Sequence, residues 1–171
     1  PGPRFGGGNE KAGDGHDFIE MATNAGASVV MAHRKVTCAA PVVWVDDTLD
    51  GLWQLGSYSR KRTSAKVVGI TGSSGKTTLR AWLQAILSPM ANCHASEGSL
   101  NNHWGVPLSL ARMAAGSDVG LFEIGTNHPG EIEPLSRLVE PDIALVLNVL
   151  PAHIGNFSGN KQSTPKIFLQ I

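Results

Sequence analysis

Residues 71–78 read Thr-Gly-Ser-Ser-Gly-Lys-Thr-Thr, and the pattern around them decides the fold. The apolar run before them, residues 67–70, predicts a buried strand, and residues 79–87 carry apolar side chains at helical spacing. A glycine-rich turn between a strand and a helix is the context that a phosphate-binding loop needs, because its backbone N–H groups converge at the positive end of the helix dipole. The residues expected to bind a nucleotide are Thr71, Gly72, Ser73, Ser74, Gly75, Lys76, Thr77 and Thr78.

Two side chains of this loop have expected roles in phosphate chemistry. Lys76 would reach the β- and γ-phosphates of ATP, and the Thr77 hydroxyl would ligate Mg²⁺. The general pattern G-x-x-x-x-G-K-[ST] is matched imperfectly, because Ile70 stands at the first glycine position and Gly72 follows two residues later. The alternative interpretation is a turn that joins a strand to a helix and binds no phosphate.

Composition and charge give bounds on the function. The chain of 171 residues has 14 Lys and Arg against 14 Asp and Glu, which gives no reason to expect nucleic acid or an anionic membrane surface as a partner. Its two cysteines, Cys38 and Cys93, form no C-x-x-C pair and no secreted disulfide framework. No apolar run approaches the length of a membrane span, and no signal peptide opens the chain. We therefore expect a cytosolic protein without membrane insertion, and we separately expect a monomer.

The N-terminal third predicts a small α/β unit. A helix is expected over residues 17–25 with Asp17 as its cap, followed by strands over residues 27–32 and 41–45. A longer helix is expected from residue 46 to about residue 62. The residues expected on one face of this helix are Leu49, Leu52, Trp53, Leu55 and Gly56.

A polar and basic run, residues 59–64, follows on this helix. We interpret it as the helix end and a linker, because positive charges at a helix C-terminus complement the dipole. A nucleic-acid-binding patch is the alternative. The linker divides the chain into an expected N-terminal domain, residues 1–64, and an expected central domain, residues 65–171.

Strands alternate with helices in the second domain. Strands are expected over residues 66–71, 118–124 and 142–149, helices over residues 76–87, 104–113 and 130–139, and a loop over residues 92–102. This alternation predicts an α/β fold with a mostly parallel, doubly wound sheet. In such sheets ligands bind beyond the carboxyl ends of the strands.

Three segments should meet at that edge of the sheet. Thr71 and Glu123 end strands and residues 148–153 follow one, so a threonine, a carboxylate and the imidazole of His153 would face one crevice. Mg²⁺ prefers oxygen ligands, which favours Glu123 as a metal ligand. The alternatives are a solvated carboxylate at a strand end and a structural histidine.

An ordered series of motifs resembles the Mur ligases, the ATP-dependent amide-bond-forming enzymes of peptidoglycan synthesis. Their signature T-G-[TS]-x-G-K-T matches residues 71–77, and it lacks a glycine at the position of Ile70. Further motifs are most similar to those of the family members that add D-alanyl-D-alanine to UDP-N-acetylmuramoyl-tripeptide. These are GSLNNHWGVPL at 98–108, EIGTNHPGEI at 123–132, AHIGNF at 152–157, and DGHDF at 14–18 in the part that resembles the UDP-substrate domain.

The resemblance implies an ATP- and Mg²⁺-dependent ligase. A peptide carboxylate would attack the γ-phosphate of ATP, and the amine of D-Ala-D-Ala would then attack the acyl phosphate. Thr77 and Glu123 would bind one Mg²⁺, and His153 a second metal. Asn101 and Asn102 would lie near the nucleotide-sugar substrate. The implied catalytic residues are Lys76, His153 and Lys166, the last as the candidate for the carbamylated lysine of the family.

The chain also departs from the family, and we expect a truncated copy. The residues before Asp14 do not reproduce the usual opening, residues 158–165 do not match the helix that carries the lysine, and the remaining domains would lie beyond Ile171. Activity of this chain alone is therefore not expected. Two alternatives stay open: another Mur or folylpolyglutamate-type ligase, and a nucleotide-binding remnant without turnover or an interaction module.

Overall fold

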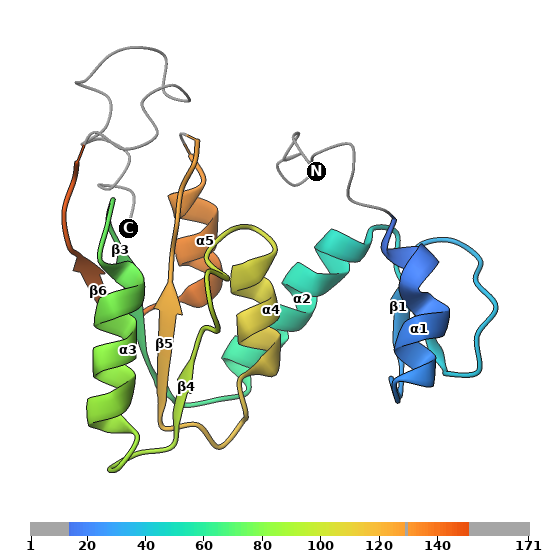
Figure 1. Cartoon of the computed structure of the whole chain (residues 1–171), viewed down its shortest axis with the longest axis horizontal. Helices are drawn as coiled ribbons and strands as arrows, with labels where there is room; N and C mark the ends of the chain where they lie inside the picture. The colour runs from blue at the N-terminus through green and yellow to red at the C-terminus, as the bar shows by residue number, and fades with distance from the viewer. Residues whose placement is uncertain (1–13, 129, 151–171) are drawn as a thin grey trace. The chain divides into compact units, whose positions relative to one another are not determined.

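The computed structural model describes residues 14–128 and 130–150. The chain divides into two compact units, Pro1–Gly51 and Leu52–Ile171. The division falls inside helix α2 (Thr48–Lys61), so the two ends of this helix belong to different units. Helices and strands alternate from α2 onward, all strand pairs are parallel in the part of the chain that the structure describes, and the predicted α/β class is confirmed (Figure 1).

The first unit holds a short helical segment and two strands. The 3₁₀ turn η1 (Gly15–Phe18) leads into α1 (Ile19–Asn24), and β1 (Val30–Ala32) pairs in parallel with β2 (Val42–Trp44). The helix lies where the sequence predicted it, but the predicted cap is wrong. Asp14, not Asp17, caps the segment, because its carboxylate accepts a hydrogen bond from the backbone N–H of His16 and starts the 3₁₀ turn earlier.

Helix α2 begins as the sequence predicted. The Asp47 carboxylate accepts hydrogen bonds from the backbone N–H groups of Leu49 and Asp50 at 2.7 and 3.0 Å, which is the geometry of an N-cap. Farther along, Gly56 is buried, and a Cβ there would lie 3.1 Å from the Cα of Pro107. Leu55 was expected on the same face, but it is 44% exposed, because the helix turns this side chain away from the contact.

The second unit is built on a four-stranded sheet in the order β4-β5-β3-β6, with every pair parallel. Its strands are β3 (Lys66–Thr71), β4 (Cys93–Ala95), β5 (Val119–Glu123) and β6 (Ile143–Val146). Strand β4 lies inside the segment that the sequence predicted to be a loop. It was missed because three half-buried residues, Cys-His-Ala, give no alternation of apolar and polar side chains.

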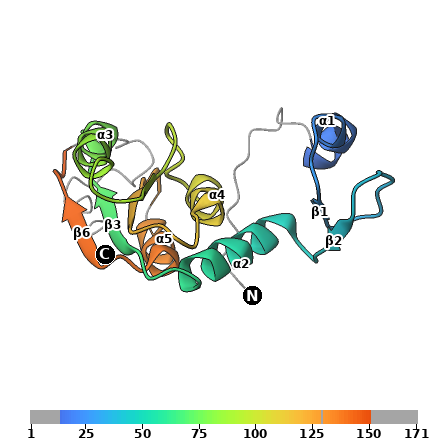
Figure 2. The ribbon, with the colours of Figure 1, turned by 90° about the horizontal axis from the view of Figure 1, so that it is seen from below.

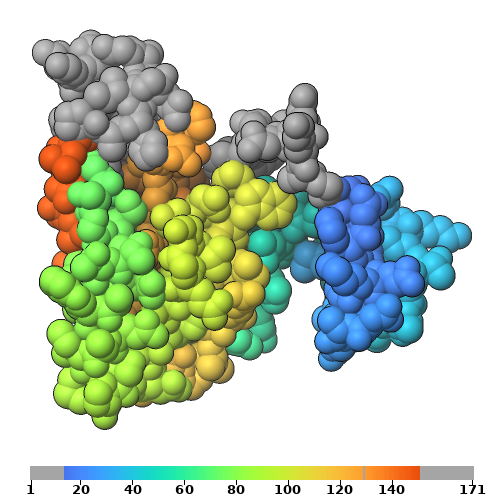
Figure 3. All heavy atoms as spheres, viewed as in Figure 1, coloured from blue at the N-terminus to red at the C-terminus, as the bar shows by residue number. Residues whose placement is uncertain are grey.

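Helices cover both faces of this sheet (Figure 1, Figure 2). Helix α3 (Lys76–Leu87) lies on one face, and α4 (Gly105–Arg112) and α5 (Ile132–Val139) lie on the other. The outer side of α3 is at the surface of the unit (Figure 3), and Trp82 and Ile86 there are 65% and 61% exposed. The helix is therefore held only by its inner side.

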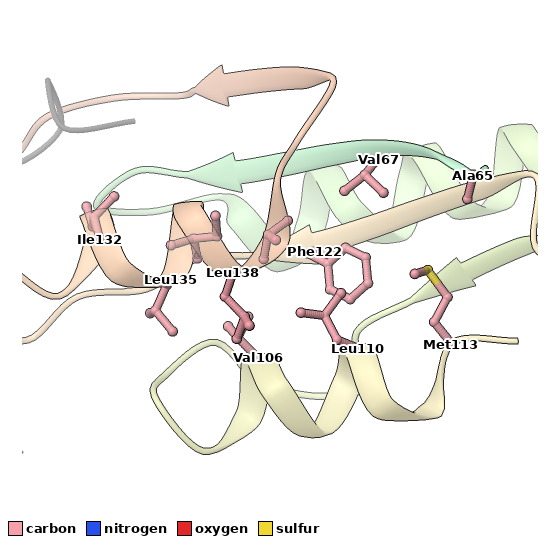
Figure 4. Close-up of a cluster of buried hydrophobic side chains, with 11 residues drawn as sticks. Ala65, Val67, Val106, Leu110, Met113, Phe122, Ile132, Leu135 and Leu138 are labelled. Carbon is pink, nitrogen blue, oxygen red and sulfur yellow. The ribbon is translucent and has the colours of Figure 1, made fainter. Parts of the chain in front are cut away.

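Strand residues alternate between two cores. Val68, Ile70 and Leu121 are buried toward α3, where Leu79 and Leu83 pack against them. The other core lies between the sheet, α4 and α5 (Figure 4). Its buried side chains are Ala65, Val67, Val106, Leu110, Met113, Phe122, Ile124, Ile132, Leu135, Leu138 and Val139, with Trp53 of α2 packed against them.

Two arginines of the basic run fasten the end of α2 to this unit. Arg60 Nε donates to the carbonyl oxygen of Val139 at 2.9 Å, and Arg62 Nη2 donates to that of Met113 at 2.8 Å. Both carbonyls lie at helix C-termini, of α5 and α4, where intrahelical donors run out. Two of the three charges of the run therefore have structural partners, which argues against a nucleic-acid patch.

Gly105, the first residue of α4, tests this packing. A Cβ there would lie 2.5 Å from both Cα and the carbonyl carbon of Leu100. Replacing glycine by alanine in a helix usually stabilises a protein by about 1 kcal/mol. For Gly105→Ala we expect the opposite, a loss of about 1–3 kcal/mol in the free energy of unfolding, because the backbone at Leu100 must move.

Denaturant unfolding followed by circular dichroism measures this loss. Gly116→Ala is the matched control, since a Cβ at Gly116 would meet nothing within 4 Å. We expect the control to stay within about 0.5 kcal/mol of the parent chain. A Gly105→Ala variant as stable as the control would contradict the described packing.

Candidate functional site

The loop between β3 and α3 needs its two glycines for one shared reason, and Gly72 for a second. The φ angles of Gly72 and Gly75 are 142° and 85°, both in the positive range that side chains disfavour. Gly72 passes close to the chain after β6, and a Cβ there would lie 3.1 Å from Cβ of Leu147 and 3.2 Å from the backbone nitrogen of Asn148. Ile70, the departure from the general pattern, is a fully buried core residue of β3, so a glycine at that position is not needed for the turn.

Asn148 fastens the loop to the end of β6. Its Oδ1 accepts from the Ser74 backbone N–H, its Nδ2 donates to the Ser74 carbonyl, and its own carbonyl accepts from the Ser73 N–H, each at 3.1 Å. The Ser73 hydroxyl also accepts from the backbone N–H of Leu150 at 2.9 Å. Two loop N–H groups are thus engaged within the protein. The N–H groups at the start of α3, on residues 76–78, lack intrahelical acceptors and are the donors suited to an anion.

Lys76 extends back across the loop. Its Nζ donates to the carbonyl oxygen of Gly72 at 2.6 Å. Burial lowers the pKa of Lys76, and the nearby charge of Glu123 acts in the opposite direction. The lysine is therefore a partly desolvated point charge at the rim of the loop, where its hydrogen bond to Gly72 can be exchanged for one to a phosphate oxygen.

Glu123 is the buried acidic group of the site. It is 1% exposed at the end of β5 and accepts two hydrogen bonds from α3. The Thr77 hydroxyl donates to Oε2 at 3.0 Å, and Arg80 Nε donates to Oε1 at 2.7 Å. The structure therefore brings together Thr77 and Glu123, the two expected metal ligands that lie among the described residues.

The spacing of these two oxygens is compatible with Mg²⁺. Neighbouring ligands of an octahedral Mg²⁺ at about 2.1 Å lie about 3 Å apart, close to the separation of Thr77 Oγ1 and Glu123 Oε2. Within residues 14–128 and 130–150, no three His, Cys, Asp or Glu side chains gather that could hold a metal ion. A metal at this site would therefore need phosphate oxygens or water among its ligands.

Sequence reasoning missed Arg80 and the loop contacts of Asn148. Arg80 is 8% exposed and lies one turn after Thr77, on the side of α3 that faces the sheet. The available signal was a basic residue three positions after Thr77, and so on the same face of the helix as that threonine. For Asn148 the signal was an amide side chain two residues after β6, at the edge where ligands bind in such sheets.

The remaining loop threonines differ in their surroundings. Thr71 is buried, and its hydroxyl donates to the carbonyl oxygen of Ile124 at 2.8 Å, which ties the end of β3 to the end of β5. Thr78 is exposed in the first turn of α3. Thr71 therefore serves the sheet, and its expected role in nucleotide binding stays a prediction.

The two asparagines expected near the substrate have structural contacts of their own. The Asn102 carboxamide oxygen accepts from the backbone N–H groups of Trp104 and Gly105, at 3.1 and 2.9 Å, and caps α4. The backbone carbonyl of Asn101 accepts from the N–H of Gly125 at 2.7 Å. A Cβ on Gly125 would lie 2.8 Å from Asn101 Cγ, so these residues meet just past the end of β5.

Two further motifs form local hydrogen-bond clusters. Glu131 accepts from the backbone N–H groups of Asn127 and His128, at 2.7 and 3.0 Å, and closes the turn after β5.

In the first unit, hydrogen bonds from His16 are the main reason that the pKa of Asp14 is lowered to about 2. Arg34 adds an ion pair to Asp14 at 2.9 Å. These contacts explain the local residue pattern without a ligand.

Two expected site residues, His153 and Lys166, lie outside the described residues. The second metal site and the carbamylated lysine therefore remain predictions. In the part of the chain that the structure describes, no helix has both the length and the apolar character needed to cross a membrane.

Comparison with known proteins agrees with the motif pattern. Residues 70–168 match the model of the Mur ligase middle domain. The UDP-N-acetylmuramoyl-tripeptide–D-alanyl-D-alanine ligases of Bacillus subtilis and Escherichia coli are 35% and 37% identical to this chain over 161 and 158 residues. These matches cover 92% and 91% of this chain but 35% of each relative. The chain thus spans about a third of the length of these relatives.

Solved structures give the same result. A crystal structure of MurF from Acinetobacter baumannii superposes with a TM-score of 0.78 at 35% identity, covering 99% of this chain and 36% of that chain. MurF ligase from Thermotoga maritima in complex with ADP gives a TM-score of 0.77 at 34% identity, covering 92% and 37%.

The family match includes the part of the structure that carries the candidate site. It begins at Ile70, the core residue before the loop, and extends over Lys76, Thr77 and Glu123. It covers more than half of the chain. The chain belongs to the Mur ligase family.

Proposed function

We propose that this chain is part of a cytoplasmic ATP-dependent ligase that adds D-alanyl-D-alanine to UDP-N-acetylmuramoyl-tripeptide in peptidoglycan synthesis. The observation that carries the proposal is the contact of Thr77 with Glu123 beside the glycine loop, which would join the proposed phosphate site to the carboxylate proposed as a metal ligand. The substrates are those in the names of the relatives. The motif EIGTNHPGEI at 123–132 favours this member of the family over other ligases on the scaffold.

ATP binding has support from both the loop and a relative. The free N–H groups at the start of α3 and the Lys76 ammonium supply donors and positive charge for the phosphates. The solved relative from Thermotoga maritima is described as a complex with ADP. Thr77 and Glu123 would hold Mg²⁺, which when bound would neutralise charge on the phosphate oxygens.

The residues of this chain would act by positioning and by charge. The peptide carboxylate attacks the γ-phosphorus, ADP leaves, and the amine of D-Ala-D-Ala then attacks the acyl phosphate carbonyl and displaces phosphate. Lys76 and the N–H groups of residues 76–78 would hold the phosphates in line with the attacking oxygen. No side chain of the loop needs to act as a nucleophile.

The same proposal assigns the rest of the chain. Residues 1–64 would form a UDP-substrate domain and residues 65–171 part of the ATP-binding domain, working as a monomer without nucleic acid. Asn101 and Asn102 would lie near the nucleotide sugar, and His153 and Lys166 would serve the second metal. The proximity of Asn101 to Gly125, two residues after Glu123, supports the first assignment.

A ligation assay tests the proposed function. The 171-residue chain and a fusion of this chain to the remaining residues of the Escherichia coli relative are incubated with ATP, Mg²⁺, UDP-tripeptide and D-Ala-D-Ala. We expect the pentapeptide product, detected by mass, from the fusion and not from the chain alone, because the acceptor amine must be held in line and water excluded. A fusion that unfolds cooperatively but makes no product would contradict the proposal.

Lys76→Ala tests the phosphate loop. We expect the affinity for ADP, measured by calorimetry, to fall about tenfold or more, because a charge-assisted contact to phosphate is lost while the backbone donors remain. Lys66→Ala is the matched control, since Lys66 pairs with Asp142 at 2.7 Å outside the site and is 75% exposed. If the Lys76 variant and the control bind ADP equally well, the assignment of residues 71–78 as a phosphate-binding loop is wrong.

Glu123→Gln tests the metal role. We expect the variant to weaken ADP binding in Mg²⁺ by about tenfold and to change binding in EDTA much less, because only the metal requires the carboxylate charge. Glu133→Gln, which alters an exposed carboxylate that pairs with Arg137 at 2.9 Å, is the control. Losses of equal size with and without Mg²⁺ would favour a purely structural role for Glu123.

A further inference from the structure

A buried arginine competes for the carboxylate that is the proposed metal ligand. The Arg80 side chain is 10% exposed and that of Glu123 1% exposed, and Nε of Arg80 lies 2.7 Å from Oε1 of Glu123. Arg80 Nη1 also donates to Gln84 Oε1 at 3.3 Å. Taking two charges out of water is costly, so a buried ion pair is weak evidence for stability alone. Its place beside Thr77 suggests a role in the site.

The two oxygens of the Glu123 carboxylate have different partners. Oε1 is occupied by Arg80, and Oε2 accepts from the Thr77 hydroxyl at 3.0 Å. Rotation of the Glu123 side chain would break the bond to Arg80. Arg80 therefore holds the carboxylate in one orientation, with Oε2 as the oxygen available to a cation.

The charges near Glu123 oppose the entry of a free cation. The single carboxylate faces the Arg80 guanidinium, and Lys76, the residue before Thr77 in the chain, supplies a second positive charge, which interacts electrostatically with Glu123. A divalent ion arriving alone would meet two positive charges and one negative charge. The phosphates of a nucleotide would reverse this balance, because they bring several negative charges to the same place.

We propose that Arg80 positions the Glu123 carboxylate and partly neutralises its charge. Its positive charge lowers the affinity of the site for a free divalent cation, so that the metal ion is retained only together with the nucleotide. The inference rests on the proposed function, specifically on Thr77 and Glu123 as metal ligands. It adds a residue that acts on the metal through Glu123. Loss of its charge strengthens the binding of a free metal ion, whereas loss of a metal ligand weakens it.

The test is a titration of the 171-residue chain with Mn²⁺ alone, followed by electron paramagnetic resonance of the free ion, without nucleotide. We expect Arg80→Met to bind Mn²⁺ about tenfold more tightly than the parent chain, because the competing charge is removed. Arg80→Lys keeps the charge and is expected to stay within about threefold of the parent. Thermal unfolding without metal should show Arg80→Met below the parent, with a larger upward shift on adding Mn²⁺.

Arg137→Met is the matched control, because it removes an arginine–glutamate pair that is exposed on α5. It should leave Mn²⁺ binding unchanged. If Arg80→Met does not fold, Arg80→Gln takes its place with the same expected gain, since it removes the charge and keeps a donor for Glu123.

Glu123→Gln separates the two proposals. Two results together would overturn this inference: Glu123→Gln loses Mn²⁺ binding, and Arg80→Met or its substitute binds Mn²⁺ no more tightly than the parent chain. They would leave the metal role of Glu123 standing. Mn²⁺ binding that does not respond to Glu123→Gln overturns the metal role itself. Tighter Mn²⁺ binding in the uncharged variant that disappears when Glu123→Gln is added supports the inference.

Discussion

The contact between the buried Glu123 carboxylate and helix α3 is the constraint on which the site depends. A carboxylate with 1% exposure must be paired, and both of its partners, Thr77 and Arg80, lie in the first two turns of α3. This fixes the start of α3 over the end of β5. Because the helix start also carries Lys76 and the N–H groups that lack intrahelical acceptors, the same contact would set where the proposed anion and cation bind.

Sheet order makes this arrangement possible. Strand β3 lies between β5 and β6, so the loop that leaves β3 has Glu123 on one side and Asn148 on the other. Gly72 allows the loop to pass against the chain after β6, and Gly75 allows it to turn into α3. A loop held from both sides has its backbone fixed in advance, which is the preorganisation that the proposed binding of phosphates would require.

The sequence predicted the parts of the fold that have strong local signals. Strand β3 and helix α3 have the predicted bounds, because a continuous apolar run and a helical apolar period flank an unambiguous glycine turn. Strand β4 was missed because its pairing with β5, and not its own three residues, makes it a strand. The cap of the first helical segment was misplaced because Asp14 and Asp17 are equally good capping residues, and only the turn geometry distinguishes them.

The same distinction separates the site residues that sequence could find from those that it could not. Thr77 and Glu123, which the structure places in contact, were predicted together because each follows a local rule, a phosphate-loop threonine and an acidic residue at a strand end. Arg80 and Asn148 act through residues 43 and 74 positions away in the chain. Local patterns could mark Arg80 and Asn148 as polar residues in notable positions but could not identify their partners, since each contact exists only once the parallel strands have brought three loop starts to one edge. The groups that hold the loop and the carboxylate in place are therefore the ones that require the structure.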